Sequence, residues 1–593
     1  MIGYSGIYHR DKSWSPSDDD HLTEMINQLQ GTSALEPLIT EFESHGRCAM
    51  KIASIDPRSP MITKENEVRK LCLFGELYPQ STANSLLEAV LADDSENLTS
   101  SIQDLNGAFN LIVYDKTNSQ VKIFRDIGGV KACFYHDNGQ EVIFSSGLRS
   151  VAKSSLYRDK QVDTKGLWLN LAYPAPPQPL TAFKDISCLE RGSRLSINST
   201  VTTDHYWTIP SRDIDIGMDF NYAVERVHST LTDATSDRVQ GIQNLGSTLS
   251  GGVDSAYLSA LAFQNNEHTE AYTFKLAGEE YSQLNEDDVA ALTARKYGMK
   301  HHIKSFVYDD FMEDFQTLIK LYEQPGISIG AYYSIAKLGH QLGYSHVVNG
   351  LAGDELFGGF HFFKHLSYWP LLRLLSPVAS LVPSNRTKGI DKFIKVAGAG
   401  SIDEYYSRAF AIYLDKELKN VFNNLYFSAL EAQQELYNPR REPFKDSISG
   451  LMHYMFSNCP NHHIYRFESF SNHFGIQPLY PFLDNNVIEH AFKVPSRFKV
   501  KGHKRKIVLK QAATPYVVQP ALTENKRGVG APVNSWMNTH LKDIKEDKLN
   551  RLKQREIFNA QYIDQIIKEY PQGYGKKLWK LVMTELWMEE FID

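Results

Sequence analysis

Residues Ser250–Ser255 read SGGVDS, and this stretch decides the prediction of the fold. A strand-like segment, residues 242–249, leads into it, and a helical pattern with an apolar face at Tyr257, Leu258 and Leu261 follows it. The two glycines between them mark a tight loop. The sequence therefore predicts a strand, a glycine loop and a helix in succession.

The residue types in this loop are suited to binding phosphate. Glycines let the backbone approach a bulky anion, and the start of the following helix directs amide groups toward it. The hydroxyls of Ser250 and Ser255 add donors beside the amides of Gly251 and Gly252. Asp254 would repel phosphate, unless it holds a Mg²⁺ ion that bridges the phosphate oxygens. A plain glycine turn is the alternative for an SGG sequence taken alone.

In this context the whole hexapeptide resembles the pyrophosphate loop of the ATP pyrophosphatase superfamily, whose members cleave ATP to AMP and pyrophosphate. The sequence contains no G-x-x-x-x-G-K-[ST] pattern, so the loop is not of the Walker type. The resemblance implies ATP as the nucleotide and Mg²⁺ as the metal ion.

Residues 349–360, NGLAGDELFGGF, resemble the SGEGxDELFGGY phrase in the synthetase domain of asparagine synthetases. The resemblance implies that Asp354 and Asp254 together hold Mg²⁺ with pyrophosphate, and two carboxylates from two strand ends suit such a cation. Capping of the following helix by Asp354-Glu355 is the alternative.

Leu351 stands at the position of the family glutamate in this phrase. In asparagine synthetases that glutamate helps to handle the aspartate and the incoming ammonia. In β-lactam synthetases, which are relatives that close an internal amide, the corresponding position resembles a tyrosine instead. A leucine can perform neither polar task. Either another residue supplies the base, or the attacking amine arrives already neutral.

Three further phrases extend the resemblance toward the end of the chain. Residues 477–484 (QPLYPFLD) resemble EVRVPFLD, residues 506–510 (KIVLK) resemble KYxLR, and residues 526–532 (KRGVGAP) resemble KxGFGxP. The KYxLR register implies that the Lys506 ammonium neutralises charge on the adenylate phosphate and on the oxyanion formed during amine attack. Taken alone, the basic run 499–510 would be a solvated or nucleic-acid-facing stretch.

The resemblance implies one set of site residues. Asp254, Asp354 and Lys506 are the expected catalytic residues, and the two aspartates are also the expected metal ligands. The expected nucleotide-contacting residues are Leu249, Ser250, Gly251, Gly252, Asp254, Ser255, Leu276, Asn349 and Gly350. Residues 323–325 (EQP), which resemble the family's DEP phrase, support this register. His462-His463 has no metal-ligand context, and we interpret it as structural.

Residues 1–205 are rich in predicted strands. Short apolar or alternating runs, separated by turn signals, are residues 71–77, 109–114, 121–124 and 142–145. Three phrases here resemble the glutaminase domain of asparagine synthetases. They are residues 74–78 (FGELY, similar to NGEIYN), 105–109 (LNGAF, similar to LRGMFAF) and 125–131 (RDIGGVK, similar to RDxxGIKPLYY).

This half departs from the family at the positions that carry glutamine hydrolysis. Ile2 stands where processing exposes a cysteine whose thiol attacks the glutamine amide. Phe74 replaces the asparagine of the oxyanion hole, Lys51 replaces the arginine that clamps the glutamine carboxylate, and an HRGPD-type phrase is missing before it. We therefore expect this domain to be an inactive scaffold.

From residue 222 onward, predicted helices and strands alternate. Strands are expected at 271–274, 303–307 and 346–349, and helices at 288–297 and 329–342. In helix 288–297 the residues expected to face inward are Val289, Leu292, Thr293 and Tyr297. This alternation predicts a parallel, doubly wound sheet with ligands at the carboxyl ends of its strands.

The predicted fold class is α/β with two domains. The resemblance implies an Ntn-hydrolase-like αββα sandwich for residues 1–210. Residues 215–593 are expected to form a doubly wound ATP-pyrophosphatase domain with added helices. Residues 181–207 are expected to form an edge hairpin and linker, the Pro-rich segment 174–179 a surface loop, and residues 361–460 a helical region.

Composition excludes several classes of protein. The 593-residue chain is 42% hydrophobic and 22% charged, which is typical of globular domains. A formal net charge of −7 argues against a general nucleic-acid binder. The five scattered cysteines indicate reduced thiols in a cytoplasmic protein. Residues 1–20 lack the apolar core of a signal peptide, and the most apolar later run, residues 369–383, is too short to span a bilayer.

We expect an ATP-dependent, AMP-forming amide synthetase. A substrate carboxylate attacks the α-phosphate of Mg-ATP to give an acyl-adenylate and pyrophosphate, and an amine then displaces AMP. Because glutamine hydrolysis is not expected, similarity to β-lactam synthetases and lasso-peptide macrolactam cyclases implies an amine within the substrate.

The expected partner is therefore a small-molecule or peptide carboxylate, with a precursor peptide and a processing protease in the case of a cyclase. No nucleic-acid or membrane partner is expected, and a homodimer is left open. Two alternatives remain: an asparagine synthetase that uses ammonia, and a non-catalytic scaffold protein.

Overall fold

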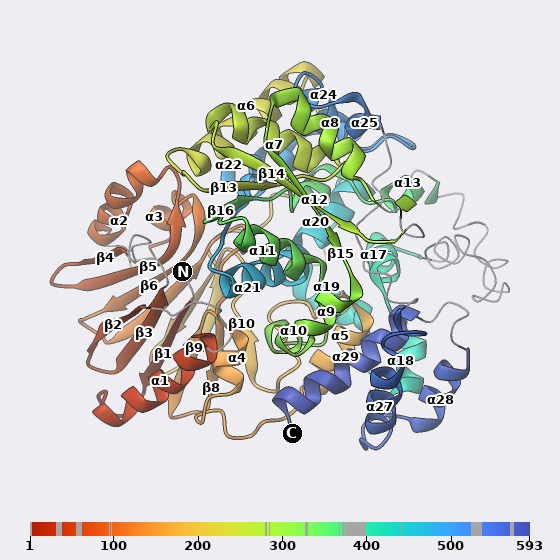
Figure 1. Cartoon of the computed structure of the whole chain (residues 1–593). Coiled ribbons are helices and arrows are strands. Elements are labelled where there is room, and N and C mark those ends of the chain that lie inside the picture. Colours follow the sequence, from red (N-terminus) through yellow and green to blue (C-terminus); the bar gives the residue numbers. More distant parts are fainter. Residues whose placement is uncertain are drawn as a thin grey trace.

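The computed structural model (Figure 1) describes most of the chain. The described residues are 3–30, 38–54, 62–93, 95, 98–278, 282–283, 285–326, 330–366, 368–369, 374, 396, 399–439, 442–523, 536–569 and 575–593. The first part of the chain forms a β-sandwich, the middle forms a parallel sheet, and helices of the last part pack between and around them (Figure 1).

The N-terminal sandwich consists of two six-stranded antiparallel sheets. The first has the order β10 (Ile186–Cys188), β8 (Phe134–Asp137), β9 (Glu141–Ser145), β1 (Gly3–His9), β3 (Cys48–Ser54) and β2 (Leu38–His45). The second has the order β12 (Val201–His205), β11 (Ser193–Ile197), β7 (Gln120–Arg125), β6 (Gly107–Asp115), β5 (Arg69–Leu77) and β4 (Ile62–Glu65). The four strands predicted from residues 71–145 and the edge hairpin at β11–β12 are confirmed.

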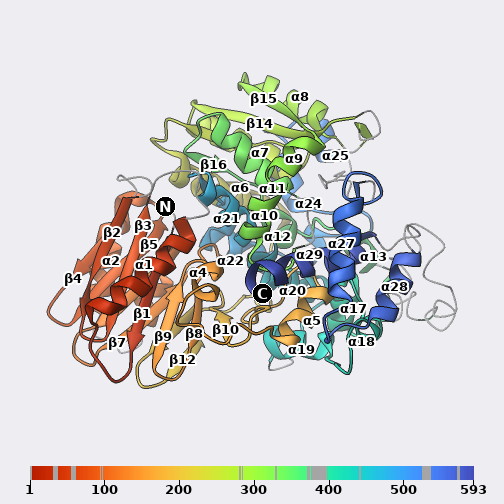
Figure 2. The same cartoon turned by 60° about the horizontal axis from the view of Figure 1, so that its bottom comes forward.

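Helices cover the outer faces of both sheets. Helices α1 (Pro16–Gln30) and α4 (Leu148–Ala152) pack on the first sheet, and α2 (Ala83–Ala92) packs on the second. Buried aromatic and aliphatic side chains, among them Tyr4, Phe74 and Phe144, fill the space between the sheets. The predicted αββα sandwich is therefore the observed arrangement (Figure 2).

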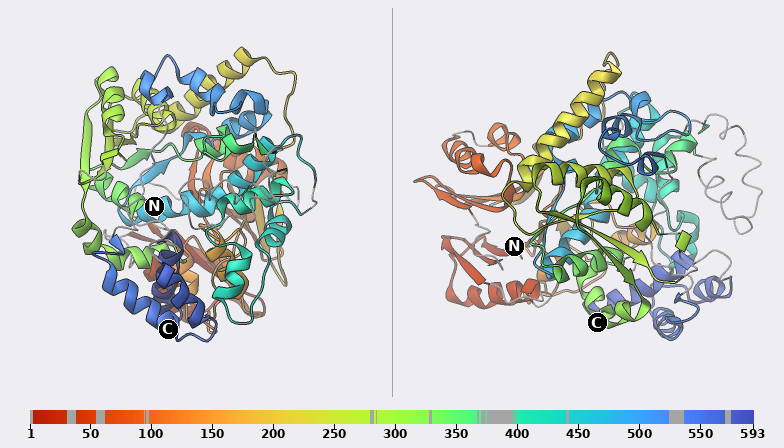
Figure 3. Two further views of the ribbon diagram at one scale, coloured as in Figure 1. Left: turned by 90° about the vertical axis from the view of Figure 1, so that its right-hand side faces the viewer. Right: turned by 45° about the horizontal axis from the view of Figure 1, so that its top comes forward.

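The middle of the chain forms the predicted parallel sheet. Its order is β15 (His301–Phe306), β14 (Thr269–Leu276), β13 (Leu245–Thr248), β16 (His346–Val348) and β17 (Gln477–Leu479), and every neighbouring pair is parallel. Helices α7 (Val253–Asn265) and α8 (Asp287–Tyr297) pack beside β14, and α11 (Ala331–Gln341) and α21 (Tyr465–His473) pack together (Figure 3). The strand order reverses between β13 and β16, where such sheets bind ligands.

Further helices lie before, between and after the strands of this sheet along the chain. They include α6 (Phe220–Val239), α12 (Gly353–Phe357), α17 (Ile402–Phe410), α18 (Asp415–Val421), α19 (Ala429–Tyr437), α20 (Ser447–Cys459), α22 (Asn485–Lys493), α24 (Ile507–Ala513), α27 (Lys542–Leu552), α28 (Ala560–Glu569) and α29 (Gly575–Phe591). Within the described ranges, none of the helices combines the length and the apolar character needed to cross a membrane.

Two sequence-based expectations about burial are wrong. In α8, Val289 and Thr293 are buried as expected, but Leu292 is 41% exposed, because the buried stripe runs through Ala290 and Ala294 beside them. The Pro-rich segment 174–179 does not lie on the surface: its residues are buried through Gln178. The Arg466 guanidinium donates to the Pro174 carbonyl oxygen (2.9 Å), so side chains from elsewhere replace water as partners of this backbone.

Side chains from the two halves of the chain are bonded across a buried boundary. Asp484 Oδ2, at the start of α22, accepts from Asn106 Nδ2 (2.7 Å) and from Arg238 Nη1 (2.8 Å). Lys131 Nζ and Glu468 Oε2 form a second buried pair at 2.5 Å. The sandwich and the parallel sheet are therefore joined by polar contacts that water does not reach.

Candidate active site

The SGGVDS loop connects β13 to α7, as predicted. The Ser255 hydroxyl oxygen lies 2.8 Å from the Ser250 hydroxyl oxygen. It also accepts a hydrogen bond from the Ser250 backbone amide (3.0 Å). The Gly252 amide donates to Ser250 Oγ (3.2 Å). A Cβ atom on Gly251 would lie 2.9 Å from Glu286 Cβ, so the loop packs too closely for a larger residue. The serines thus close the loop into a compact turn in front of the helix.

The second predicted segment follows β16 at the same edge of the sheet. The Asn349 amide donates to Leu479 O (2.9 Å), and its side-chain oxygen accepts from the Leu351 amide (2.9 Å). Ala352 then takes a left-handed conformation (φ +74°) from which α12 begins. A Cβ atom on Gly353 would lie 2.7 Å from Asp254 Oδ1, so this glycine permits α12 to approach the first loop.

The three expected catalytic side chains meet between these loops. The Lys506 ammonium forms an ion pair with Asp254 Oδ2 and a second one with Asp354 Oδ1, at 2.5 Å. All three side chains are largely buried. Lys506 has φ +54° at the residue before α24, a conformation that costs free energy in a non-glycine residue and is concentrated at functional sites.

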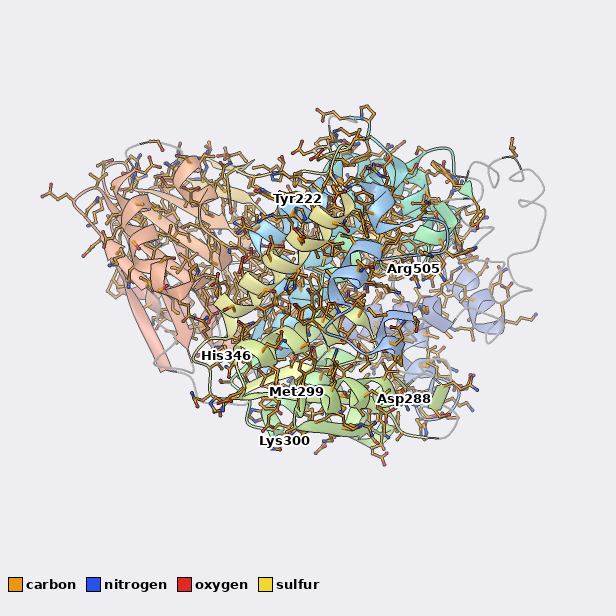
Figure 4. All side chains as sticks on the ribbon, turned by 90° about the horizontal axis from the view of Figure 1, so that it is seen from above. Tyr222, Asp288, Met299, Lys300, His346 and Arg505 are labelled. Atoms are coloured by element: carbon orange, nitrogen blue, oxygen red, sulfur yellow. The ribbon has the colours of Figure 1, made fainter. Side chains whose placement is uncertain are left out.

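Gly359 and Arg505 border the charged side chains of Asp254, Asp354 and Lys506, which we call the ion triad. A Cβ atom on Gly359 would lie 1.7 Å from Asp354 Oδ1 and 2.1 Å from Lys506 Cε, so only glycine fits. Arg505 Nη1 donates to the Gly359 carbonyl oxygen, and burial lowers the Arg505 pKa against the opposing effect of Asp354. In Figure 4, Arg505 and Asp288 lie toward the right of the view, and Lys300 and His346, next to or at the starts of β15 and β16, lie toward the left.

The donor set fits a magnesium ion that is shared with phosphate. Asp254 Oδ1 is buried and has no hydrogen-bond partner. Among the residues that the structure describes, no group of three or more His, Cys, Asp or Glu side chains is placed to hold a metal ion. Mg²⁺ is usually bound in proteins by one or two carboxylates, and phosphate oxygens and water occupy its remaining coordination positions.

The remaining expected nucleotide-contacting residues lie at the carboxyl edge of the sheet. Leu249 is buried, and its amide donates to Tyr272 O (3.0 Å). At the end of β14, the Leu276 amide donates to Asn285 Oδ1 (2.8 Å), and Asn285 Nδ2 donates to Leu276 O (2.9 Å). Asn285 was not predicted from the sequence, since a single loop amide belongs to no recognisable motif.

Two of the positions at which the N-terminal half departs from glutamine-using enzymes are described by the structure. The Phe74 ring is buried and packs edge to face against Tyr4, with centroids 5.1 Å apart. Lys51 Nζ lies 2.8 Å from Asp19 Oδ1 and 2.8 Å from Thr23 Oγ1. Ile2 lies outside the described residues, as do residues 526–532.

The thiols of the chain are poorly suited to act as nucleophiles. All five cysteines are buried. Burial raises the pKa of Cys48 and of Cys133 to about 12, and it also raises the pKa of Cys72 and of Cys188. A thiol must be ionised to attack, so these side chains stay unreactive near neutral pH.

Two family models match the chain. One, described as asparagine synthase, covers residues 226–589, and the other, described as a glutamine amidotransferase domain, covers residues 44–208. The first match alone spans more than half of the chain. The chain belongs to the asparagine synthase family.

Known members of this family are similar over most of their length. Asparagine synthetase [glutamine-hydrolyzing] 1 of Bacillus subtilis is 21% identical over 99% of this chain and 96% of its own. A putative asparagine synthetase [glutamine-hydrolyzing] of Mycobacterium bovis is 20% identical over 85% and 80%. Among solved structures, an allosteric regulatory enzyme of purine biosynthesis is 10% identical over 51% and 80%, with a TM-score of only 0.26. Family membership supports an ATP-dependent amide-forming ligase.

Proposed function

We propose that this asparagine synthase family member is an AMP-forming amide synthetase that activates a carboxylate as its adenylate. The observation that carries the proposal is the buried ion triad of Asp254, Lys506 and Asp354 at the switch point of a parallel sheet. The two carboxylates can bind the metal ion that accompanies the ATP phosphates. The ammonium can stabilise the negative charge that develops on the substrate during the reaction.

Each part of the site has a separate task in this proposal. The loop amides and hydroxyls of residues 250–255 bind and orient the pyrophosphate end of ATP. Asp254 and Asp354 would hold Mg²⁺, which supplies charge neutralisation on the leaving pyrophosphate. Lys506 stabilises negative charge on the adenylate phosphate and on the carbonyl oxygen when the amine attacks.

The amine does not come from glutamine hydrolysis on this chain. Phe74 offers a ring where an oxyanion donor is required, and the Lys51 ammonium is already engaged by Asp19 and Thr23. The buried cysteines with raised pKa support the same conclusion. An assay for glutamate formation from glutamine, with and without ATP, tests this: activity above background in purified protein would contradict it.

The finer form of the proposal places the amine within the substrate, as in β-lactam synthetases and lasso-peptide macrolactam cyclases. A peptide substrate would then arrive as a precursor cut by a protease. The rival form is ammonia-dependent conversion of aspartate to asparagine, and activity with L-aspartate and ammonium chloride would favour it. A non-catalytic scaffold would not need to retain Asp254, Asp354 and Lys506 in mutual contact.

Product analysis tests the proposal as a whole. With Mg²⁺ and an accepted carboxylate, ATP should yield AMP and pyrophosphate, and Asp254→Asn or Asp354→Asn should lower turnover by orders of magnitude. Formation of ADP and orthophosphate would contradict the proposal. Asp137→Asn, in an ion pair with Arg10 on the sandwich, is the matched control and should leave turnover unchanged.

A further inference from the structure

The attacking amine must lose a proton when it becomes an amide, and Leu351 offers no group to accept it. We propose that His463 accepts this proton, that Tyr332 fixes the orientation of its ring, and that the Glu355 carboxylate stabilises the imidazolium that forms. This inference rests on the proposed function, since it assigns a base to the second half of that reaction.

His463 lies in an irregular turn of the backbone, and this turn changes the direction in which its side chain points. Between α20 and α21 the chain forms a π-helical turn, η3 (Pro460–Ile464). Such turns insert one extra residue per turn, which redirects the side chains, and they occur often at functional sites. The sequence-based interpretation of His463 as merely structural did not take this turn into account, because a π-turn has no hydrophobic period of its own.

Two helices bring polar groups to the His463 ring. His463 Nδ1 lies 2.7 Å from the Tyr332 hydroxyl, at the start of α11. His463 Nε2 lies 4.0 Å from Glu355 Oε1 on α12. The imidazole is 22% exposed, whereas the Glu355 side chain is 5% exposed, so the ring is the more accessible of the two groups.

This group is adjacent to the ion triad. Glu355 directly follows Asp354, which contacts Lys506. Helix α11 leads into β16, so Tyr332 at its start is expected toward the carboxyl edge of the sheet, where Asn349 and Leu351 follow that strand. The proton acceptor thus comes from a different segment than the one that bears Leu351.

The neighbouring titratable groups leave His463 as the base. Glu355, on α12, also faces the Cys459 thiol at the end of α20, and burial followed by the charge of Glu355 raises the Cys459 pKa well above its usual range. Lys506 is engaged by two carboxylates. Tyr332 is bonded to His463 itself. A partly exposed imidazole between a phenol and a carboxylate is a group that can serve as a general base.

The step balances as follows. The amine nitrogen forms a bond to the acyl carbon, and the bond from that carbon to the AMP oxygen breaks with its electron pair leaving on AMP. The proton released from nitrogen moves to His463 Nε2. Nδ1–H of the resulting imidazolium donates to the Tyr332 hydroxyl oxygen, and Glu355 stabilises the positive charge.

Comparison of the two half-reactions in His463→Gln tests the inference. The carboxylate probe is the one that supports ATP–pyrophosphate exchange among L-aspartate, L-glutamate and peptides bearing either side chain. Exchange should stay within about twofold of wild type, whereas amide formation with ammonium chloride should fall roughly 10²–10⁴-fold. Hydroxylamine, which is uncharged at neutral pH and needs less help from a base, should still give hydroxamate at a rate close to that of wild type.

His503→Gln is the matched control, since His503 Nε2 also lies 2.9 Å from a tyrosine hydroxyl, that of Tyr368, but on the exposed surface. It should leave both half-reactions unchanged. Tyr332→Phe should move the acidic limb of the pH profile for amide formation to lower pH, because the imidazolium loses an acceptor.

Unchanged amide formation in His463→Gln, or equal loss of exchange and of both amine reactions, would overturn the inference alone. An absence of exchange in the wild-type chain would overturn the proposed function, and the inference with it.

Discussion

Lys506 is the residue on which the electrostatics of the site depend. Its ammonium touches both Asp254 and Asp354, and Gly359 leaves just enough room for its side chain. Two buried carboxylates without a nearby cation would be costly in free energy, because they lose their hydration and repel each other. The Lys506 ammonium between them offsets this cost. The same cation is positioned to meet negative charge that develops on the substrate.

Replacement of Lys506 by alanine should remove one preorganised partner of the oxyanion. Amide formation should fall roughly 10²–10³-fold, more than the affinity for ATP does. Lys506→Arg should rescue poorly, because a planar guanidinium does not replace a compact ammonium. Steady-state kinetics of amide formation, combined with equilibrium binding of ATP, measure the two effects separately.

Lys504→Ala is the control for this variant, since Lys504 is exposed. Equal, small effects at positions 504 and 506 would show that the assignment of Lys506 is mistaken. Arg505 is not a neutral control, because its guanidinium donates to the Gly359 carbonyl oxygen.

Motif residues could be placed from the sequence because their chemistry is local. Asp254 and Asp354 each follow a strand and a glycine-containing loop, so parallel strands bring them to the same edge. The contacts of Arg505 and Asn285, and that of His463 with Tyr332, could not be identified in this way. The partners of Arg505 and His463 lie 146 and 131 residues away in the sequence, and Asn285, nine residues from Leu276, belongs to no recognisable motif.

Elements with a regular period were predicted well. The β13–α7 unit and strands β14, β15 and β16 lie within a few residues of their expected positions. The π-turn η3 and the start of α12 were not predicted, because both depend on backbone conformations imposed by packing. The basic run 499–510 also differs from a solvated stretch, since Lys499 and Lys506 are buried.

Lys499, at the end of α23 (Ser496–Lys499), should make stability depend on pH. Burial lowers its pKa to about 7 in the folded state, against the opposing effect of Asp446, while an unfolded lysine titrates near ~10.4. Between these values the unfolded state binds the proton and the folded state does not, so stability rises with pH across this window. Below pH 7 Lys499 is protonated in the folded state as well, and burial of its charge then lowers the free energy of unfolding by the full amount.

Lys499→Met should therefore unfold at higher temperature than wild type at pH 6–7, and the difference should shrink toward pH 10. Thermal denaturation at several pH values checks this. The exposed Lys504→Met should leave the pH dependence as it is in wild type. A wild-type protein whose stability falls from pH 7 to pH 9 through this group would contradict the assignment.

At the scale of the whole molecule, polar contacts join the sandwich to the second half of the chain. Asp484 links Asn106 of the sandwich to Arg238 of α6, and its ion pair with Arg238 is only 3% exposed on each side. Helix α29 reaches the sandwich again through the Arg149–Glu590 ion pair at 2.7 Å. The sequence predicted two domains, but not these contacts, because the partners lie hundreds of residues apart.

Asp484→Ala should destabilise both halves together, since it leaves the Arg238 guanidinium buried without its carboxylate. The expected loss is about 3–5 kcal/mol in the free energy of unfolding, measured by denaturant titration with probes in each half. Asp137→Ala, which breaks the more exposed Arg10 pair within the sandwich, should cost about 1 kcal/mol or less. Two separate transitions, with only one of them shifted, would show that the halves are independent.

The central claim is that the carboxylate is activated by attack on the α-phosphate of ATP. It is tested most directly by following oxygen from a carboxylate labelled with ¹⁸O through one turnover, with the products analysed by mass spectrometry. If an acyl-adenylate forms, the amine attacks the acyl carbon, and one ¹⁸O atom must appear in AMP. Label in orthophosphate with formation of ADP, or AMP without label, would contradict the account.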